Sequence, residues 1–308
     1  MSTLLVSQPN FESHVTPSGH PERADRIRAI EDALAAPRFA GLVRKMAPDG
    51  DITLAELVHA PDYLKRLRAA RPAEGIGRID EDTFISSGSL DAVATGIGGA
   101  TLALDSVLLG EVENAFCAIR PPGHHAEIDT PMGFCLVNTI AVLAREAQRK
   151  YGAERVAIVD FDVHHGNGTQ DIFKTDPTVF YASSHQMPLY PGTGARRETG
   201  VGNIMNAPLP PDSGTAEMRN AYDELILPGL EHFGPDLVLI SAGFDADRRD
   251  PLAQLNWTPG DFAWITGKLL DFAQRRCEGR VVSLLEGGYD RQGLAEGAAA
   301  HVAMLMGD

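Results

Sequence analysis

The chain has 308 residues, of which 44% are hydrophobic and 22% charged, and its formal net charge is -15. This is the composition of a globular protein, and its acidity argues against a nucleic-acid surface while weakly favouring cationic substrates. No apolar run approaches the roughly 20 residues of a membrane span, and the N-terminus lacks the features of a secretion signal, so we expect a cytoplasmic protein with no membrane partner.

The first third of the sequence predicts helices. Residues 11–36 lead through a Gly/Pro turn into apolar residues at helical spacing. Residues 55–71 and 85–110 give two further helical stretches. The glycines of the last stretch indicate close packing against a neighbour, since glycine otherwise weakens a helix.

From residue 115 onward, strands and helices alternate. Five short apolar runs predict buried parallel strands, at 115–119, 156–161, 179–183, 237–241 and 281–285. Helical patterns follow at 138–150, 215–233, 259–275 and 293–306. Because no linker, repeat or low-complexity segment interrupts the alternation, we expect a single α/β domain over residues 1–308.

Four of these five strands run directly into polar residues. The runs are followed, in chain order, by RPPGHHAE, by Asp162 and His164, by AGFDADRRDP and by EGGYD. Ligands of doubly wound sheets collect beyond the carboxyl ends of the strands. The sequence therefore predicts one site at which the four clusters meet.

The strand over residues 156–161 leads into three titratable residues spaced by two, Asp160, Asp162 and His164. Extended backbone points such side chains to one side, so Asp162 and His164 can reach one ion while Asp160 stands behind them. A carboxylate and an imidazole suit zinc or another first-row divalent cation. Since desolvating these groups is costly, we expect either ligation or a dense hydrogen-bond network.

Asp245, after the next long apolar run, would complete a site with three protein ligands and an open position for water or substrate. The pair His124 and His125 follows Pro-Pro-Gly, which suits one imidazole as a base and the other as a proton relay. Asp160 and Asn167 are the expected partners of the two rings, and a carboxylate favours the charged ring more than an amide does.

Tyr289 follows two glycines, and its hydroxyl could turn toward the metal and stabilise an oxyanion. Each feature also has a structural interpretation: the histidine pair and the GGY turn could be ordinary packing. Asp245 and Asp247 could cap a helix or pair with the two arginines that follow. The four clusters together favour metal-activated water attacking a carbonyl.

Six segments, in this order and spacing, resemble the histone deacetylase family: RPPGHHAE, GFCLVN, VDFDVHHGNGTQDIF, PGTG, SAGFDADRRDPL and LEGGYD. The likeness is strongest to the class II branch, the related bacterial deacetylases and the acetylpolyamine amidohydrolases, and it runs from HPER near residue 20 to about residue 295. It implies an arginase-deacetylase fold, with a central, mainly parallel sheet of about eight strands, helices on both faces and the active site at the C-terminal ends of the strands. It also implies zinc-dependent hydrolysis of an N-acetyl amide to an amine and acetate.

The resemblance assigns roles motif by motif. It implies three zinc ligands: Asp162, His164 and Asp245. It implies three catalytic residues, a base and acid, its electrostatic partner and a carbonyl-polarising hydroxyl: His125, His124 and Tyr289. Behind the two imidazoles it places Asp160 and, as in class II, Asn167.

The same resemblance implies a substrate tunnel and two monovalent cation sites. The tunnel would be lined by Gly133, Phe134, Tyr190 and Leu252. The first cation, identified with potassium, would lie by Asp160, Asp162, His164, Ser183 and Ser184, and the second by Phe173, Asp176 and Val179. Arg26 matches a basic residue near the family's inner acetate channel.

Leu252 at the tunnel's gatekeeper position, and the short segment between His125 and Gly133, favour acetyl-lysine or a broad range of small amides over acetylpolyamines. The stretch aligned with the family's peptide-backbone anchor, near Ser86–Ser89, departs from the family pattern. An acetylpolyamine amidohydrolase is the first alternative. Two others are an arginase-type dinuclear hydrolase, which would use Asp247 beside Asp245, and a non-catalytic sensor of acetylated amines. A homo-oligomer is possible.

Overall fold

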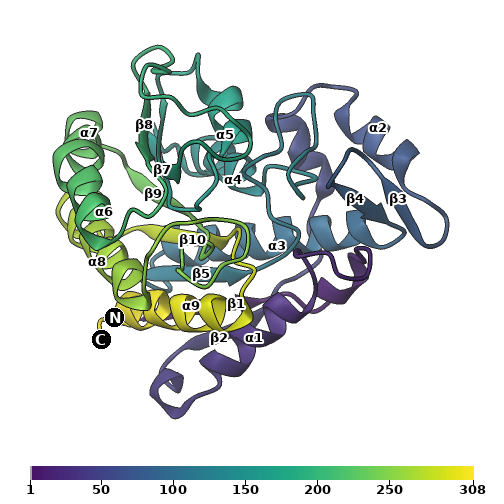
Figure 1. Ribbon diagram of the computed structural model, residues 1–308, viewed down its shortest axis with the longest axis horizontal. Helices are drawn as coiled ribbons and strands as arrows, with labels where there is room; N and C mark the ends of the chain where they lie inside the picture. The colour runs from purple at the N-terminus through teal and green to yellow at the C-terminus, as the bar shows by residue number, and fades with distance from the viewer. Residues whose placement is uncertain (1) are drawn as a thin grey trace.

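The computed structural model of the chain describes residues 2–308 and is built around one eight-stranded sheet (Figure 1). Its order is β2-β1-β5-β10-β9-β6-β7-β8, and every neighbouring pair is parallel. In chain order the strands are β1 (Thr3–Ser7), β2 (Val43–Met46), β5 (Asn114–Ala118), β6 (Val156–Asp160), β7 (Val179–Gln186), β8 (Ile204–Leu209), β9 (Leu237–Ala242) and β10 (Val281–Leu285). A separate antiparallel hairpin joins β3 (Ile76–Arg78) to β4 (Phe84–Ser86).

Helices cover both faces of the sheet. The α-helices are α1 (Asp25–Leu34), α2 (Tyr63–Ala70), α3 (Ser89–Leu108), α4 (Thr139–Tyr151), α5 (Asn167–Phe173), α6 (Thr215–Ala221), α7 (Leu227–Phe233), α8 (Pro259–Arg276) and α9 (Arg291–Met306). Residues of α1, α8 and α9 share one hydrophobic cluster, and those of α3 and α4 share another. Figure 1 shows α1 lying beside α9, so the two ends of the chain pack together.

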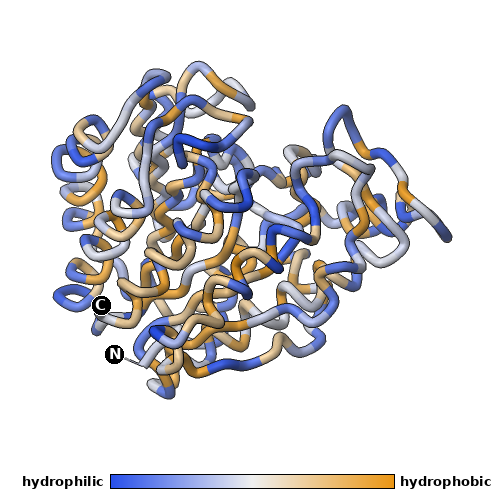
Figure 2. The backbone as a smooth tube through the Cα atoms, turned by 60° about the horizontal axis from the view of Figure 1, so that its bottom comes forward, coloured by the Kyte–Doolittle hydropathy of each residue, from blue (hydrophilic) through white to orange (hydrophobic). Residues whose placement is uncertain are grey.

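The pleat of the sheet explains the two clusters. In β5, Phe116 and Ala118 face the cluster of α1, α8 and α9, whereas Ala115 and Cys117 face the cluster of α3 and α4. Because both faces are covered, every residue of β5, β6, β7, β9 and β10 is buried, and these strands are largely apolar except for the polar second half of β7. Figure 2 shows the hydrophobic segments gathered inside and the hydrophilic ones along the outer loops.

The predicted fold class is confirmed, as are the five predicted strands. The sequence did not predict β1, β2 and β8: β1 has only three apolar residues in a row, and β2 and β8 lie at the edges of the sheet and lack an unbroken buried run. The short hairpin strands β3 and β4 were not predicted either. The first helix follows the predicted Gly/Pro turn and begins at Asp25. The stretch predicted over 55–71 divides into a 3-10 helix and α2, and the third helix begins at Ser89 rather than at residue 85. The helix predicted over 215–233 is continuous but contains a π-helical turn between α6 and α7.

A single domain over residues 1–308 stays a prediction, which the packing of both chain ends supports; Met1 lies outside the described residues. Among residues 2–308, no helix is both long enough and apolar enough to cross a membrane.

Candidate active site

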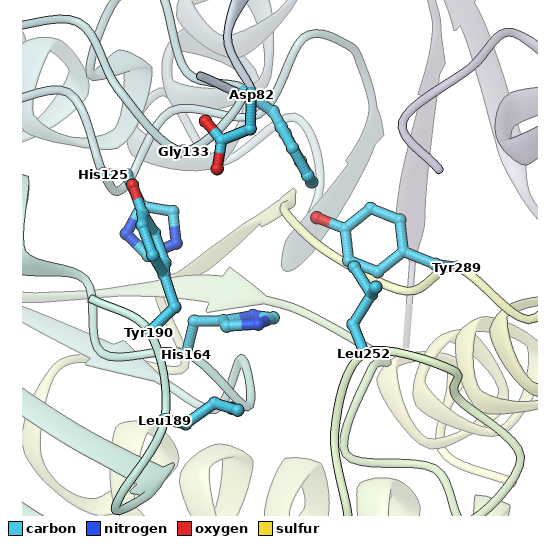
Figure 3. A pocket seen from close by; sticks show the side chains of 9 residues that line it. Asp82, His125, Gly133, His164, Leu189, Tyr190, Leu252 and Tyr289 are labelled. Carbon is cyan, nitrogen blue, oxygen red and sulfur yellow. The ribbon is translucent and has the colours of Figure 1, made fainter. Parts of the chain in front are cut away.

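The four polar clusters meet because their strands are neighbours. The sheet order places β5, β10, β9 and β6 side by side and parallel, so all four end at the same edge. The loops that follow them bring His125, His164, Leu252 and Tyr289 into one cavity of about 220 Å³. The remaining lining side chains come from the loops around them (Figure 3): Asp82, Gly133, Phe134, Leu189 and Tyr190.

Three buried residues at this edge form a group that could hold a metal ion, Asp162, His164 and Asp245. Each offers a ligand atom within 4.8 Å of the others. His164 Nδ1 lies 3.1 Å from an oxygen of Asp162 and 3.1 Å from an oxygen of Asp245. Two carboxylates converging on one imidazole nitrogen are the donor set of a divalent cation such as zinc. A β-carbon at Gly287 would collide with both carboxylates, so this position needs glycine.

His125 is oriented by two further side chains. Its Nδ1 lies 2.8 Å from Asn167 Oδ1, while Asn167 Nδ2 donates to Glu127 at 2.7 Å. Because the amide nitrogen is committed to Glu127, its oxygen faces the ring, and the ring nitrogen at Nδ1 must carry the proton. The Nε2 of neutral His125 therefore carries a lone pair. Glu127 was not assigned a role from the sequence, although it ends the RPPGHHAE motif.

His124 has a different partner. Its Nδ1 lies 3.0 Å from Asp160 Oδ2, and the same oxygen accepts a 2.9 Å hydrogen bond from the hydroxyl of Tyr181. The loop that carries both histidines is held from β10, because Glu286 accepts from the backbone N–H groups of Gly123 and His124 at 2.7 and 3.2 Å. Tyr181 and Glu286 were missed because each lies within or directly after a buried strand.

The two imidazoles differ in protonation. Burial lowers the pKa of His125, and the neighbouring His124 and His164 add to this effect, so that it lies well below its ordinary value. Burial also acts on His124, but the carboxylates of Asp160 and Asp162 outweigh it and raise its pKa to about 10. The rings lie 4.0 Å apart, so one neutral and one charged imidazole stand side by side.

Tyr289 lies on the opposite wall of the cavity, with its hydroxyl turned inward (Figure 3). Burial raises the pKa of Tyr289 well above its ordinary value, although Arg26, 5.0 Å from the ring, opposes this. The hydroxyl therefore keeps its proton and remains a hydrogen-bond donor. Arg26 itself is buried and donates to the carbonyl oxygens of Glu286 and Gly288, on either side of Gly287.

Aromatic rings form the flat walls of the cavity. The ring of Phe134 lies edge-on to Tyr289 at 5.7 Å, and that of Tyr190 lies edge-on to His125 at 5.3 Å. Phe134 has a positive φ of 68°, which is rare outside glycine and occurs often at functional sites. A β-carbon at Gly133 would lie 2.5 Å from the His125 ring, so only glycine fits there.

Asp82 was not predicted from the sequence, and it is the one carboxylate among the lining residues. The prediction had instead placed the peptide-anchor stretch near Ser86–Ser89. Ser86 and Ser89 are buried and hydrogen-bond to one another at 3.0 Å, away from the lining. The predicted stretch therefore does not line the cavity, whereas Asp82, four residues before Ser86, does.

The other predicted residues do not line the cavity. Asp247 forms a bidentate salt bridge with Arg249, with 2.8 Å between nitrogen and oxygen in each contact. An arginase-type second metal would require this carboxylate. Ser183 and Ser184 lie on β7, where their hydroxyls bond to His185 and Tyr222. The carbonyl groups of Phe173, Asp176 and Val179 gather at the start of β7.

Comparison with known proteins gives a consistent result across sequence and structure. The family described as "Histone deacetylase domain" matches residues 20–305 of this chain. A protein of Archaeoglobus fulgidus named "Probable deacetylase" is 39% identical over 95% of this chain and 83% of its own length. The "Histone deacetylase-like amidohydrolase" of Pseudomonas aeruginosa is 38% identical over 88% of this chain and 73% of its own length.

A solved structure shares the whole fold. The structure titled "Crystal Structure of HDA15 HD domain" superposes with a TM-score of 0.93 and is 35% identical in sequence. The superposition covers 100% of this chain and 90% of that one.

Proposed function

The chain belongs to the histone deacetylase family, and from this premise we propose that it is a zinc-dependent amidohydrolase that removes an acetyl or other short acyl group from an N-acetylated amine, above all acetyl-lysine. Its family makes it a deacetylase-type hydrolase. One observation carries the finer proposal: an imidazole with a free lone pair, a protonated tyrosine hydroxyl and a potential metal ligand, His164, line the same cavity of about 220 Å³.

Asp162, His164 and Asp245 would hold the zinc ion. Their three donors leave positions open for substrate and water. When bound, the ion supplies Lewis-acid polarisation of the amide carbonyl and lowers the pKa of a water molecule. We assign a potassium ion, the first of the two monovalent cations implied by the family resemblance, to the neighbouring group of Asp160, Asp162, His164, Ser183 and Ser184.

His125 acts as the general base in this proposal. Its proton at Nδ1 is committed to Asn167, so Nε2 is the atom that takes a proton from water as the oxygen attacks the carbonyl carbon. The same nitrogen then gives that proton to the amine as the C–N bond breaks. Water is consumed, and an amine and a carboxylate are released.

His124 contributes a fixed positive charge. Its Nδ1–H donates to Asp160 Oδ2, 3.0 Å from Nδ1, and the hydroxyl of Tyr181 donates to the same oxygen. Tyr289 donates a hydrogen bond to the carbonyl oxygen as negative charge develops on it. Because burial keeps the tyrosine protonated, it needs no change of protonation state before it donates.

The cavity supports two substrate classes. Its apolar walls and Leu252 at the rim suit the methylene chain of acetyl-lysine. Asp82 adds a carboxylate to the lining, and the chain carries a net charge of -15, which together favour substrates with an N–H donor or a second cationic amine. Acetylpolyamines are therefore the second candidate.

The test is acetate release by zinc-loaded protein from acetyl-lysine peptides and from acetylated putrescine, cadaverine and spermidine, with and without a hydroxamate inhibitor. Hydroxamate-sensitive turnover of the peptides supports the lysine deacetylase, and preference for the polyamines would transfer the assignment to the second class. Tight binding of both classes without turnover would mean that the protein is a sensor and would overturn the catalytic proposal.

A further inference from the structure

Three backbone carbonyl groups converge at the junction between α5 and β7. They belong to Phe173, the last residue of α5, to Asp176 in the turn and to Val179, the first residue of β7. Rings of carbonyl oxygens directed at one point are how proteins replace the hydration shell of a monovalent cation. We call these three groups the carbonyl cage; the family resemblance had implied a potassium ion here.

The centre of the carbonyl cage is taken by a side chain. Asn203 Nδ2 lies 2.8 Å from the oxygen of Phe173, 2.9 Å from that of Asp176 and 2.8 Å from that of Val179. The identity of the amide nitrogen is unambiguous, since all three partners can only accept hydrogen bonds. Asn203 Oδ1 is turned away and accepts from the backbone N–H of Val201 at 3.2 Å. Asn203 is 5% exposed, so water does not compete for these bonds.

A permanent positive charge stands next to the carbonyl cage. The guanidinium of Arg145 pairs with the Asp176 carboxylate at 2.6 Å and lies 4.8 Å from the centre of the Phe173 ring. The other oxygen of Asp176 accepts from the backbone N–H and the hydroxyl of Thr178 at 2.9 and 2.6 Å. The one carboxylate that could favour a cation here is thus already neutralised, and a second positive charge would be repelled.

The first predicted cation group is different. Asp160 keeps a carboxylate among buried oxygens of β6 and β7, and its partners are His124, Tyr181 and the backbone of Asp162. The carbonyl cage, in contrast, contains neutral oxygens only, and the neutral amide of Asn203 is enough to satisfy them as hydrogen-bond acceptors.

We propose that the carboxamide of Asn203 is a built-in replacement for a monovalent cation in the carbonyl cage, so that the junction of α5, β7 and β8 is held together without an ion. The amide has two hydrogens for three oxygens, and one hydrogen is shared between two of them. With the amide in place of the cation, the stability of this junction does not depend on the concentration of monovalent cations. The same junction positions α5, which begins with Asn167, the partner of His125.

Thermal unfolding of Asn203→Ala in potassium chloride and in choline chloride, at equal ionic strength, tests this inference. The substitution empties the cage and removes the hydrogen-bond donor that the three carbonyl groups share, which is costly. The oxygens of Phe173 and Asp176 keep one backbone N–H donor each, at 2.9 and 3.3 Å. We expect the Tm to fall by at least about 5 °C in choline and to recover at least half of this loss in potassium. Potassium bound elsewhere would change the Tm of both proteins. The quantity to compare between the two salts is therefore the difference in Tm between the variant and the native protein.

Asn206→Ala is the matched control. Asn206 is also a buried asparagine of the same segment, but its amide donates to Gln170 and Glu198 instead of the cage. We expect this variant to lose stability equally in both salts. Equal losses in both salts for Asn203→Ala as well would overturn the proposal.

A second measurement does not depend on the folding of any variant. Crystals of the native protein grown in rubidium chloride report bound monovalent cations by anomalous scattering. We expect no rubidium peak among the oxygens of Phe173, Asp176 and Val179, whatever is found near Asp160. A peak within the cage, with the Asn203 side chain displaced, would refute the inference.

Discussion

The backbone N–H of Tyr289 donates a 2.7 Å hydrogen bond to one carboxylate oxygen of Asp250, and the backbone N–H of Leu252 donates to the other oxygen at 2.9 Å. Both donors belong to residues that line the cavity. Asp250 is 7% exposed and therefore fixes two walls of the cavity relative to one another. Burial raises the pKa of Asp250 to about 7, and the nearby carboxylate of Asp245 adds to this effect.

Asp250→Asn should break one of the two hydrogen bonds that fix Leu252 and Tyr289 relative to one another. An amide has only one acceptor oxygen, so it cannot accept from both loops, and its NH₂ group would face a backbone N–H. We expect kcat/KM for an acetyl-lysine peptide to fall at least about tenfold, equivalent to about 1.4 kcal/mol, with the zinc content unchanged.

The matched control for Asp250→Asn is Asp261→Asn. Asp261 is also buried and accepts from backbone and hydroxyl of Thr258, but it caps α8 away from the cavity. This change should cost about 1 kcal/mol of unfolding free energy and leave kcat/KM unaltered. If both variants kept native kcat/KM, the cavity walls would not depend on Asp250.

Tyr289→Phe should remove the proposed hydrogen bond to the developing oxyanion. The expected loss is about 2.7 kcal/mol of transition-state stabilisation, roughly a hundredfold in kcat, while the metal is retained. Tyr63→Phe is the control, because this buried hydroxyl donates only to the carbonyl of Leu136, at 2.9 Å. Activity of the Tyr289 variant within a few fold of native would eliminate the oxyanion role.

Asp245→Ala should abolish metal binding, whereas Asp247→Asn should not. Asp245 lies 3.1 Å from His164 within the possible ligand group, while Asp247 is paired with Arg249. Elemental analysis of the two purified variants and the native protein measures this. A native content of two metal ions per chain, reduced in the Asp247 variant, would instead support an arginase-type dinuclear site.

The sequence predicted the site best where both the chemistry of a side chain and its position relative to a strand indicated its role. Asp162, His164 and Asp245 were predicted from period-two spacing and from the end of a buried strand, and the structure brings them within 4.8 Å of one another. The edge strands β2 and β8 were missed, since an edge strand needs no unbroken apolar run, and β1 was missed because its apolar run is only three residues long.

Partners that lie far apart in sequence and act through backbone groups could not be predicted. Glu286 holds the histidine loop through backbone N–H groups 163 and 162 residues away, and Asp250 holds Tyr289 across 39 residues. Nothing in a pattern of residue types marks such acceptors, because the backbone donor exists at every position except proline. The role of Asn203 in the carbonyl cage could not be predicted for a similar reason: its three partners are backbone carbonyl groups, which every residue carries.

Asp82→Asn should alter substrate selection more than chemistry. The carboxylate lines the cavity, so removing its charge should raise KM several-fold for cationic acetylpolyamines and change kcat little. Glu81→Gln is the control, since this neighbouring exposed carboxylate does not line the cavity. If the two variants behaved alike, general surface charge rather than Asp82 would account for any preference for cations.

The stability of the protein should fall between pH 7 and pH 5, partly through His59. Burial lowers the pKa of His59 to about 4 from 6.5. Its Nδ1–H donates to the carbonyl of Glu127 at 2.8 Å, and Nε2 accepts from the backbone N–H of Asn138 at 3.0 Å, an arrangement that requires the neutral ring. Between pH 6.5 and 4 the unfolded chain binds a proton that the folded chain does not, so the stability is present above pH 6.5 and is lost as the pH falls.

His59→Gln isolates this contribution, because glutamine carries a donor and an acceptor but does not titrate. We expect urea unfolding to show that the native protein loses about 2 kcal/mol more than the variant between pH 7 and pH 5. Equal zinc concentrations in both samples make metal release at low pH a shared term, and His301, whose pKa burial lowers to about 3, is retained in both. Parallel pH profiles for the two proteins would mean that His59 can bind its proton in the folded state, and that its bond to Asn138 does not hold the start of α4.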